Sequence, residues 1–126
     1  MGEYTNVSLK GKVVSGMSVG AKIMLDYLHK FKETFGLDIF PGTLNIQLEE
    51  DFDFLKSEYI EAFEKSDGTK RGRVYFLKAK ISGFAVFLIR PEKTGHPKNI
   101  LEIVSDKNLR ERFSIKDNDF LGIIMD

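Results

Sequence analysis

The chain has 126 residues, of which 42% are hydrophobic, and its 19 basic and 19 acidic residues give a formal net charge of zero. This length predicts a single domain, residues 1–126, with one hydrophobic core. The balanced charge argues against a main role in binding nucleic acid or an anionic membrane, because both need a basic surplus. The chain has no cysteine, which excludes disulfides and thiolate chemistry and agrees with a cytoplasmic protein.

The first predicted elements are a short strand, a helix and a second strand. Residues 10–16 (KGKVVSG) predict a strand that stops at Ser15-Gly16. Between Gly20 and Phe35 apolar residues recur at spacings of three and four, which predicts a helix that ends at Gly36. Residues 43–48 alternate, as in a half-buried strand. Their polar face carries Thr43, Asn45 and Gln47, and their apolar face carries Leu44, Ile46 and Leu48.

The second half of the chain is typical of short strands joined by turns. Residues 51–64 fit a helix or a strand, and Asp67-Gly68 marks the tip of a turn. Runs at 73–81 and 84–89 predict a hairpin around Ser82-Gly83. A loop at 90–99, a strand at 100–104, one helical turn at 106–113 and a last strand at 119–125 follow. This mostly β pattern favours a small closed barrel, which removes exposed sheet edges.

Two segments in the first half have residue types suited to a phosphorylated ligand. In SGMSVGAK, residues 15–22, glycines allow close backbone approach and a helix N-terminus attracts phosphate. A plain strand-to-helix turn explains the same residues. Thr43 and Asn45 offer two hard, neutral oxygens on one strand face, which suit Mg²⁺ only when a co-ligand such as phosphate supplies negative charge. A polar, solvated strand face is the alternative.

Two basic segments lie in the second half. The loop RPEKTGHPK, residues 90–98, sets four basic side chains against the single acid Glu92, which suits either a phosphate or solvent. In the turn DKNLRERF, Leu109 and Phe113 anchor the helix and leave Lys107, Arg110 and Arg112 for solvent or a ligand.

In their order along the chain, the motifs GKVVSG, PGTLN, RPEKTGH and the segment from LEIVS to IKDND resemble the archaeal CTP-dependent riboflavin kinases. The resemblance extends from about Lys10 to Met125. It implies a small six-stranded cradle-loop (RIFT-type) β-barrel, with one substantial α-helix after the first strand and a short helical turn near the C-terminus. It also implies an enzyme that transfers the γ-phosphate of CTP to the 5′-hydroxyl of riboflavin, giving FMN and CDP.

The resemblance further implies Mg²⁺ as the cofactor and a set of site residues. Thr43 and Asn45 match metal ligands, and Thr94 and Glu102 match residues on the flavin side. Glu102 is also the candidate catalytic residue, by position alone. The positions that match nucleotide-binding residues are Met17, Ser18, Val19, Gly20, Ala21, Lys22, Lys107, Asn108, Leu109 and Arg110.

We therefore expect a cytoplasmic monomer whose partners are riboflavin or FMN and CTP or CDP, without nucleic acid or membrane. The alternative is a non-catalytic barrel that binds a flavin or nucleotide as a sensor or storage module. It is kept because the segment 17–27 departs from the family's usual sequence. A relation to small dimeric DNA-binding β proteins is disfavoured by the zero net charge.

Overall fold

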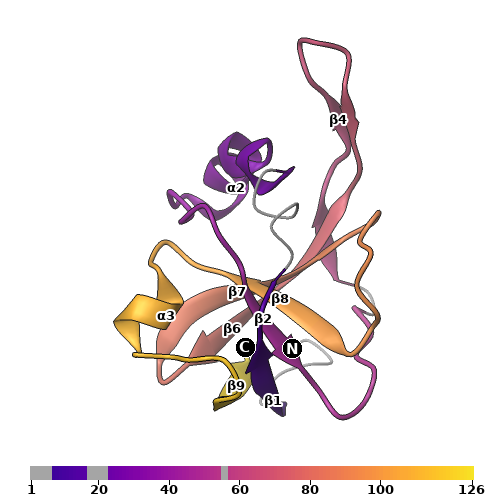
Figure 1. Ribbon diagram of the computed structural model, residues 1–126. Helices are drawn as coiled ribbons and strands as arrows, with labels where there is room; N and C mark the ends of the chain where they lie inside the picture. Colours follow the sequence, from indigo (N-terminus) through magenta and orange to yellow (C-terminus); the bar gives the residue numbers. More distant parts are fainter. Residues whose placement is uncertain (1–6, 17–22, 55–56) are drawn as a thin grey trace.

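The computed structural model describes residues 7–16, 23–54 and 57–126. Six strands in the order β6-β7-β8-β2-β1-β9 form an antiparallel barrel, which closes where β9 pairs back onto β6 (Figure 1). This mostly β barrel confirms the predicted fold class. Its strands are β1 (Ser8–Val14), β2 (Leu44–Gln47), β6 (Val74–Ile81), β7 (Phe84–Pro91), β8 (Ile100–Val104) and β9 (Phe120–Met125).

The interior of the barrel is a packed apolar core. Alternate residues of each strand point inward, as Leu101 and Ile103 of β8 do, and both are fully buried. Glu102 between them therefore faces the outside of the barrel. The inner cluster includes Val13, Leu44, Ile46, Ala79, Ile81, Val86, Leu88, Leu101, Ile103, Ile123 and Met125. Since these side chains fill the interior, polar groups that could meet a ligand lie on the outer surface.

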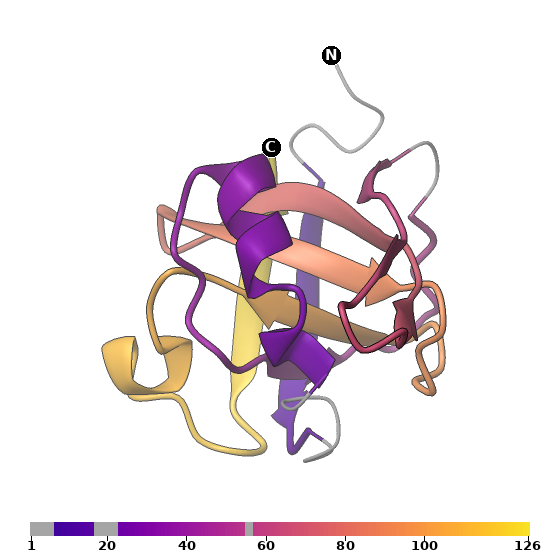
Figure 2. The same cartoon turned by 90° about the horizontal axis from the view of Figure 1, so that it is seen from above.

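Helix α2 (Leu28–Phe35) lies across the outside of the barrel wall (Figure 2). A second apolar cluster joins Phe31 of the helix to residues of β6 and β7, and the ring of Phe35 stacks on Phe87 at 3.8 Å between centroids. Gly36 ends the helix with a φ of +72°, as predicted, because a glycine adopts this left-handed conformation without a Cβ clash. Among the described residues, no helix is long and apolar enough to cross a membrane.

The predicted continuous helix from Gly20 to Phe35 is interrupted. Residues 23–25 are helical, residues 26–27 form a turn, and α2 begins at Leu28. The Asp26 carboxylate binds Lys65 at 3.0 Å and Arg71 at 2.8 Å, and the Tyr27 hydroxyl donates to the Gly72 carbonyl at 2.9 Å. These contacts with a distant segment accompany the break, and local periodicity contains no information about them.

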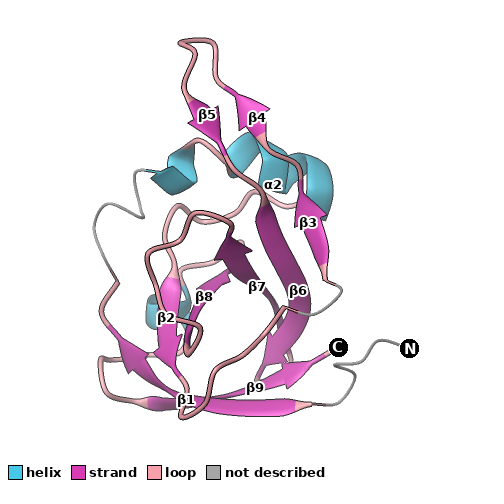
Figure 3. Cartoon of the chain, turned by 90° about the vertical axis from the view of Figure 1, so that its right-hand side faces the viewer, coloured by secondary structure: helices cyan, strands magenta, loops and turns pink. Residues whose placement is uncertain are grey.

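The segment between β2 and β6 contains short strands. Part of this segment, residues 51–64, fits either a helix or a strand by sequence. β3 (Glu58–Ile60) pairs with β6, while β4 (Phe63–Glu64) and β5 (Lys70–Arg71) form a hairpin that projects from the barrel beside α2 (Figure 3). Gly68 turns this hairpin with a φ of +88°. The tight turn between β6 and β7 is also as predicted, with positive φ at Ser82 and Gly83.

Helix α3 (Leu109–Arg112) is the predicted helical turn between β8 and β9. Leu109 is buried against the inner core and Phe113 packs at its edge. The Asn108 side chain accepts a hydrogen bond from the Glu111 N–H at 3.3 Å and so caps the helix. The anchor residues therefore set the orientation of the basic side chains of α3.

Candidate active site

The strand register places three residues in one row on the outer face of the barrel. Asn45 of β2 lies opposite Glu102 of β8, and Glu102 lies opposite Ile89 of β7. Directly opposed residues share a sheet face. Two polar side chains far apart in sequence are therefore brought together beside an apolar one.

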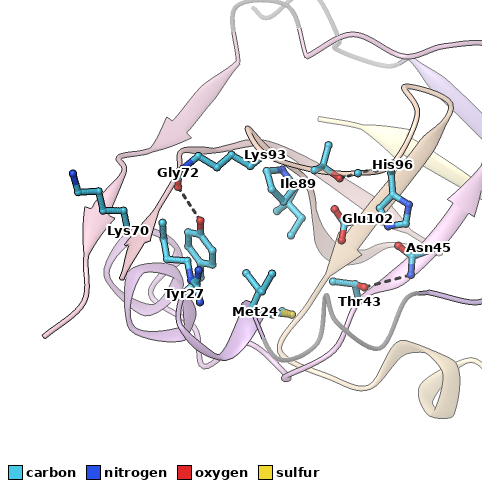
Figure 4. A pocket seen from close by; sticks show the side chains of 15 residues that line it. Met24, Tyr27, Thr43, Asn45, Lys70, Gly72, Ile89, Lys93, His96 and Glu102 are labelled. Carbon is cyan, nitrogen blue, oxygen red and sulfur yellow. Dashed lines mark hydrogen bonds between the residues drawn. The ribbon is translucent and has the colours of Figure 1, made fainter. Parts of the chain in front are cut away.

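A cavity of about 320 Å³, here the large cavity, lies over this row between the barrel wall and the 23–27 segment (Figure 4). Figure 4 shows Thr43, Asn45, His96 and Glu102 at one end, and Tyr27, Gly72 and Lys93 at the other. Its lining is apolar in the middle and polar at both ends. The described residues that line it are Ile23, Met24, Tyr27, Thr43, Asn45, Lys70, Arg71, Gly72, Ile89, Pro91, Lys93, Thr94, Gly95, His96 and Glu102.

Asn45 is buried with one of its polar atoms unpaired. Its side chain is 3% exposed, and its Nδ2 donates a long hydrogen bond of 3.4 Å to Thr43 Oγ1. Its Oδ1 has no hydrogen-bond partner among the described residues. A buried, unpaired amide oxygen is costly unless a ligand or ion satisfies it. Gly16 allows this arrangement, because a Cβ there would overlap Asn45 Nδ2.

Glu102 is the titratable group of the row. Burial raises the pKa of this carboxyl to about 7, and the positive charge of Arg90 opposes that rise. Its carboxylate points into the large cavity (Figure 4). A carboxyl with a pKa near neutrality can accept a proton at physiological pH and release it again.

A second cavity of about 180 Å³, here the small cavity, lies beside α3. Thr43 lines both cavities, so their walls share this residue. Arg110 provides a cation there, and its Nη2 donates to Asp117 Oδ1 at 2.7 Å. The small cavity is lined by Phe40, Gly42, Thr43, Leu44, Ile103, Ser105, Lys107, Asn108, Leu109 and Arg110.

The basic loop at 90–98 divides between two roles. Lys93 and His96 line the large cavity, as does Thr94, whose Oγ1 accepts from the His96 N–H at 3.2 Å. Arg90 instead donates to the carbonyls of His96 at 3.2 Å and Pro97 at 3.4 Å, which holds the loop in place. Lys98 pairs with Asp53 at 3.1 Å, outside the cavity.

The structure brings together most of the residues named from sequence. Thr43, Asn45, Thr94 and Glu102 line the large cavity, and 107–110 line the small one. Residues 17–22, also expected in the nucleotide site, lie outside the described residues.

Sequence reasoning missed the wall formed by Met24, Tyr27, Gly72 and Ile89. Met24 and Tyr27 belong to an apolar helical stripe, and such a stripe predicts core packing. The hydroxyl of Tyr27 was the single polar signal in that stripe. Ile89 was assigned to a strand, without a role in a site.

Comparisons with known proteins identify the family of this chain. A family model named CTP-dep_RFKase, described as "Domain of unknown function DUF120", matches residues 13–125. A riboflavin kinase of Staphylothermus marinus is 42% identical over 120 residues, which cover 94% of this chain and 92% of that protein. A riboflavin kinase of Ignicoccus hospitalis is 34% identical, covering 94% and 71%, and one of Archaeoglobus fulgidus is 32% identical, covering 93% and 54%. The resemblance seen in the motifs is therefore confirmed, and this chain belongs to the archaeal CTP-dependent riboflavin kinase family.

Proposed function

We propose that this protein transfers the γ-phosphate of CTP to the 5′-hydroxyl of riboflavin and releases FMN and CDP. The observation that carries the proposal is that one residue, Thr43, lines both cavities. Direct phosphoryl transfer requires donor and acceptor to lie side by side, with the attacking and leaving oxygens in line. Two adjoining cavities with different linings suit two different substrates.

The large cavity is assigned to riboflavin. The side chains of Met24, Tyr27 and Ile89 give it an apolar middle, which suits a planar aromatic ring system. Thr94 and Glu102 offer polar contacts to the hydroxylated chain of the substrate. The riboflavin kinase relatives support this acceptor by name.

The small cavity is assigned to the nucleotide. Lys107 and Arg110 supply positive charge that suits phosphate groups, and Thr43 lies where this cavity adjoins the large one. The name of the matching family model supports CTP as the donor, whereas the names of the relatives specify no nucleotide. The choice of CTP over other nucleotides is therefore the finer part of the proposal.

Thr43 and Asn45 are the residues proposed to hold Mg²⁺. The unpaired Oδ1 of Asn45 and the hydroxyl of Thr43 are hard oxygen donors, so the residues present fit the ion. The described residues contain no group of three or more His, Cys, Asp or Glu side chains able to hold a metal. Anionic ligands would then come from the nucleotide phosphates, whose charge the bound ion would neutralise.

Glu102 is proposed to accept the proton of the riboflavin 5′-hydroxyl. As the bond from this oxygen to the γ-phosphorus forms, the bond from that phosphorus to the β-phosphate oxygen breaks, and CDP leaves. The proton is then held on a carboxylate oxygen of Glu102. Burial prepares this carboxyl for the role, because it brings its pKa close to neutral pH.

The experiment incubates the purified protein with riboflavin, MgCl₂ and, separately, CTP, ATP, GTP or UTP, and separates FMN by chromatography. We expect FMN with CTP and much less with the other three. FMN with another nucleotide alone would overturn the choice of donor. Tight flavin binding without FMN from any nucleotide would instead favour the non-catalytic barrel.

A further inference from the structure

The turn before β9 carries a carboxylate that joins two parts of the site. Ser15 Oγ, just beyond the end of β1, donates to Asp117 Oδ2 at 2.6 Å. Arg110 Nη2, from α3, donates to Asp117 Oδ1 at 2.7 Å. Each carboxylate oxygen of Asp117 therefore accepts one short hydrogen bond, Oδ2 from a hydroxyl and Oδ1 from a charged guanidinium. One side chain thus ties the end of β1 to the basic lining of the small cavity.

The backbone around Asp117 is fixed by several hydrogen bonds. The Lys116 N–H donates to Asp119 Oδ2 at 2.8 Å, and the Asn118 N–H donates to the Val13 carbonyl at 2.8 Å. Asn118 has a φ of +75°, a conformation that asparagine tolerates better than most residues. Asp117 is therefore a short side chain on a fixed turn, whereas Arg110 is a long side chain with many rotamers.

This network of hydrogen bonds contributes little to the stability of the fold. The side chains of Arg110 and Asp117 are 36% and 48% exposed, and ion pairs between such exposed groups contribute little to folding. The pairing has a clearer effect on Arg110 itself, because it selects one orientation of a cation in the small cavity. The hydrogen bonds from Ser15 and Arg110 also hold the pKa of Asp117 below its ordinary value, so this carboxylate stays ionised at neutral pH.

We propose that Asp117 is a positioning residue for the nucleotide, which acts by fixing Arg110 toward the phosphates. This inference rests on the proposed function, since it assigns the small cavity to the nucleotide. It adds a residue that would not touch either substrate.

The first test compares Asp117→Asn with the wild-type enzyme, because this substitution keeps the shape and removes the charge. Restricting one long side chain corresponds to about a three- to tenfold change in affinity, so we expect the KM for CTP to rise by about that factor. The KM for riboflavin should stay unchanged. Glu61→Gln is the matched control, since it removes an exposed carboxylate that pairs with Arg73 at 3.2 Å and lines neither the large nor the small cavity.

The second test is a double-mutant cycle with Arg110→Met. If Asp117 acts through Arg110, Asp117→Asn should have little further effect on the KM for CTP once Arg110 is replaced. Asp117→Glu, which keeps the charge, should recover part of the affinity. An equal effect of Asp117→Asn in both backgrounds would overturn the proposal, and so would an unchanged KM for CTP. A lowered KM would overturn it too, because the carboxylate would then merely repel the phosphates.

Calorimetric titration of CDP in MgCl₂ separates this inference from the proposed function. Weaker CDP binding by Asp117→Asn than by wild type, lost in the Arg110→Met background, would support the positioning role even if no FMN is formed. Equal CDP affinity of wild type and Asp117→Asn would overturn the role, whatever the turnover. The midpoint of thermal unfolding of each variant is compared with that of Glu61→Gln, to check whether the variants differ in stability as well as in CDP affinity.

Discussion

Replacing Glu102 by Gln should stabilise the protein, and the gain should depend on pH. Glu102 is mostly buried on the outer wall of the barrel, and burial raises the pKa of its carboxyl from an ordinary value of 4.5 to about 7. Folding therefore places this group where its charged form is disfavoured. Gln resembles the protonated carboxyl in shape and carries no charge.

The sign and size of the effect follow from the two pKa values. Below pH 4.5 the carboxyl is protonated in the folded and unfolded chains, so its ionisation does not affect the free energy of unfolding. As the pH rises from 4.5 to 7, the unfolded chain loses this proton first, and the folded state becomes progressively less stable. Above pH 7 the loss is complete and amounts to about 3 kcal/mol.

The assay is urea unfolding of wild type and Glu102→Gln from pH 4.5 to pH 8, with EDTA present so that no divalent ion binds near the carboxylate. Other groups that titrate alike in both proteins contribute equally to their free energies of unfolding, so their contributions cancel in the difference between the two free energies. It should grow with pH in favour of the variant and level off above pH 7. At pH 8 the same substitution should lower kcat by about 100-fold or more, because the proton acceptor is lost.

A stability difference between wild type and Glu102→Gln that does not change with pH would refute this reasoning. It would mean that the carboxyl titrates in the folded protein as it does in the unfolded chain. A variant that is fully active would refute the assignment of Glu102 as proton acceptor while leaving the stability argument intact.

Three further substitutions test the same site. Asn45→Ala should abolish FMN formation while leaving the far-ultraviolet circular dichroism spectrum unchanged, because it removes the unpaired Oδ1 proposed as a metal ligand. Gly16→Ala should lower kcat by about tenfold or more, because its Cβ would displace the Asn45 side chain, whereas Gly122→Ala, which has open space around it, should leave kcat unchanged. Tyr27→Phe should lower the free energy of unfolding by about 1–2 kcal/mol in urea and raise the KM for riboflavin, because the buried Gly72 carbonyl loses its partner.

Each of these expectations has a result that contradicts it. Full activity of Asn45→Ala would remove the metal-ligand assignment. Equal activity of the Gly16→Ala and Gly122→Ala variants would show that close approach to Asn45 is unimportant. Unchanged stability and an unchanged KM for riboflavin in Tyr27→Phe would show that this hydrogen bond neither stabilises the cavity wall nor shapes it.

The strands of the barrel and their turns could be predicted from local sequence. Alternation placed Asn45 on the polar face of its strand, opposite Leu44 and Ile46, and the structure has it on the outer face of the barrel. Gly36 and Gly83 were identified because positive φ values favour glycine. These signals are local, so a single sequence contains them.

Features that depend on pairs of distant residues could not be predicted. The Asp26 carboxylate meets Arg71 across 45 positions, and this contact accompanies the turn that breaks the helix. Asp117 meets Ser15 across 102 positions. Neither pair leaves a periodic trace in the sequence, and the wall residue Tyr27 had the same spacing as the core residues around it. The sequence motifs thus identified residues at the polar end of the large cavity, whereas the residues of its wall could be identified only from the tertiary structure.

The central claim is that the two cavities, which share Thr43 in their walls, bring riboflavin and CTP together for direct phosphoryl transfer. The most direct measurement incubates the protein with riboflavin, MgCl₂ and CTP labelled on its γ-phosphate, then separates the products. We predict that the label appears in FMN and that CDP forms in equal amount. Release of the label as inorganic phosphate without labelled FMN would contradict the claim.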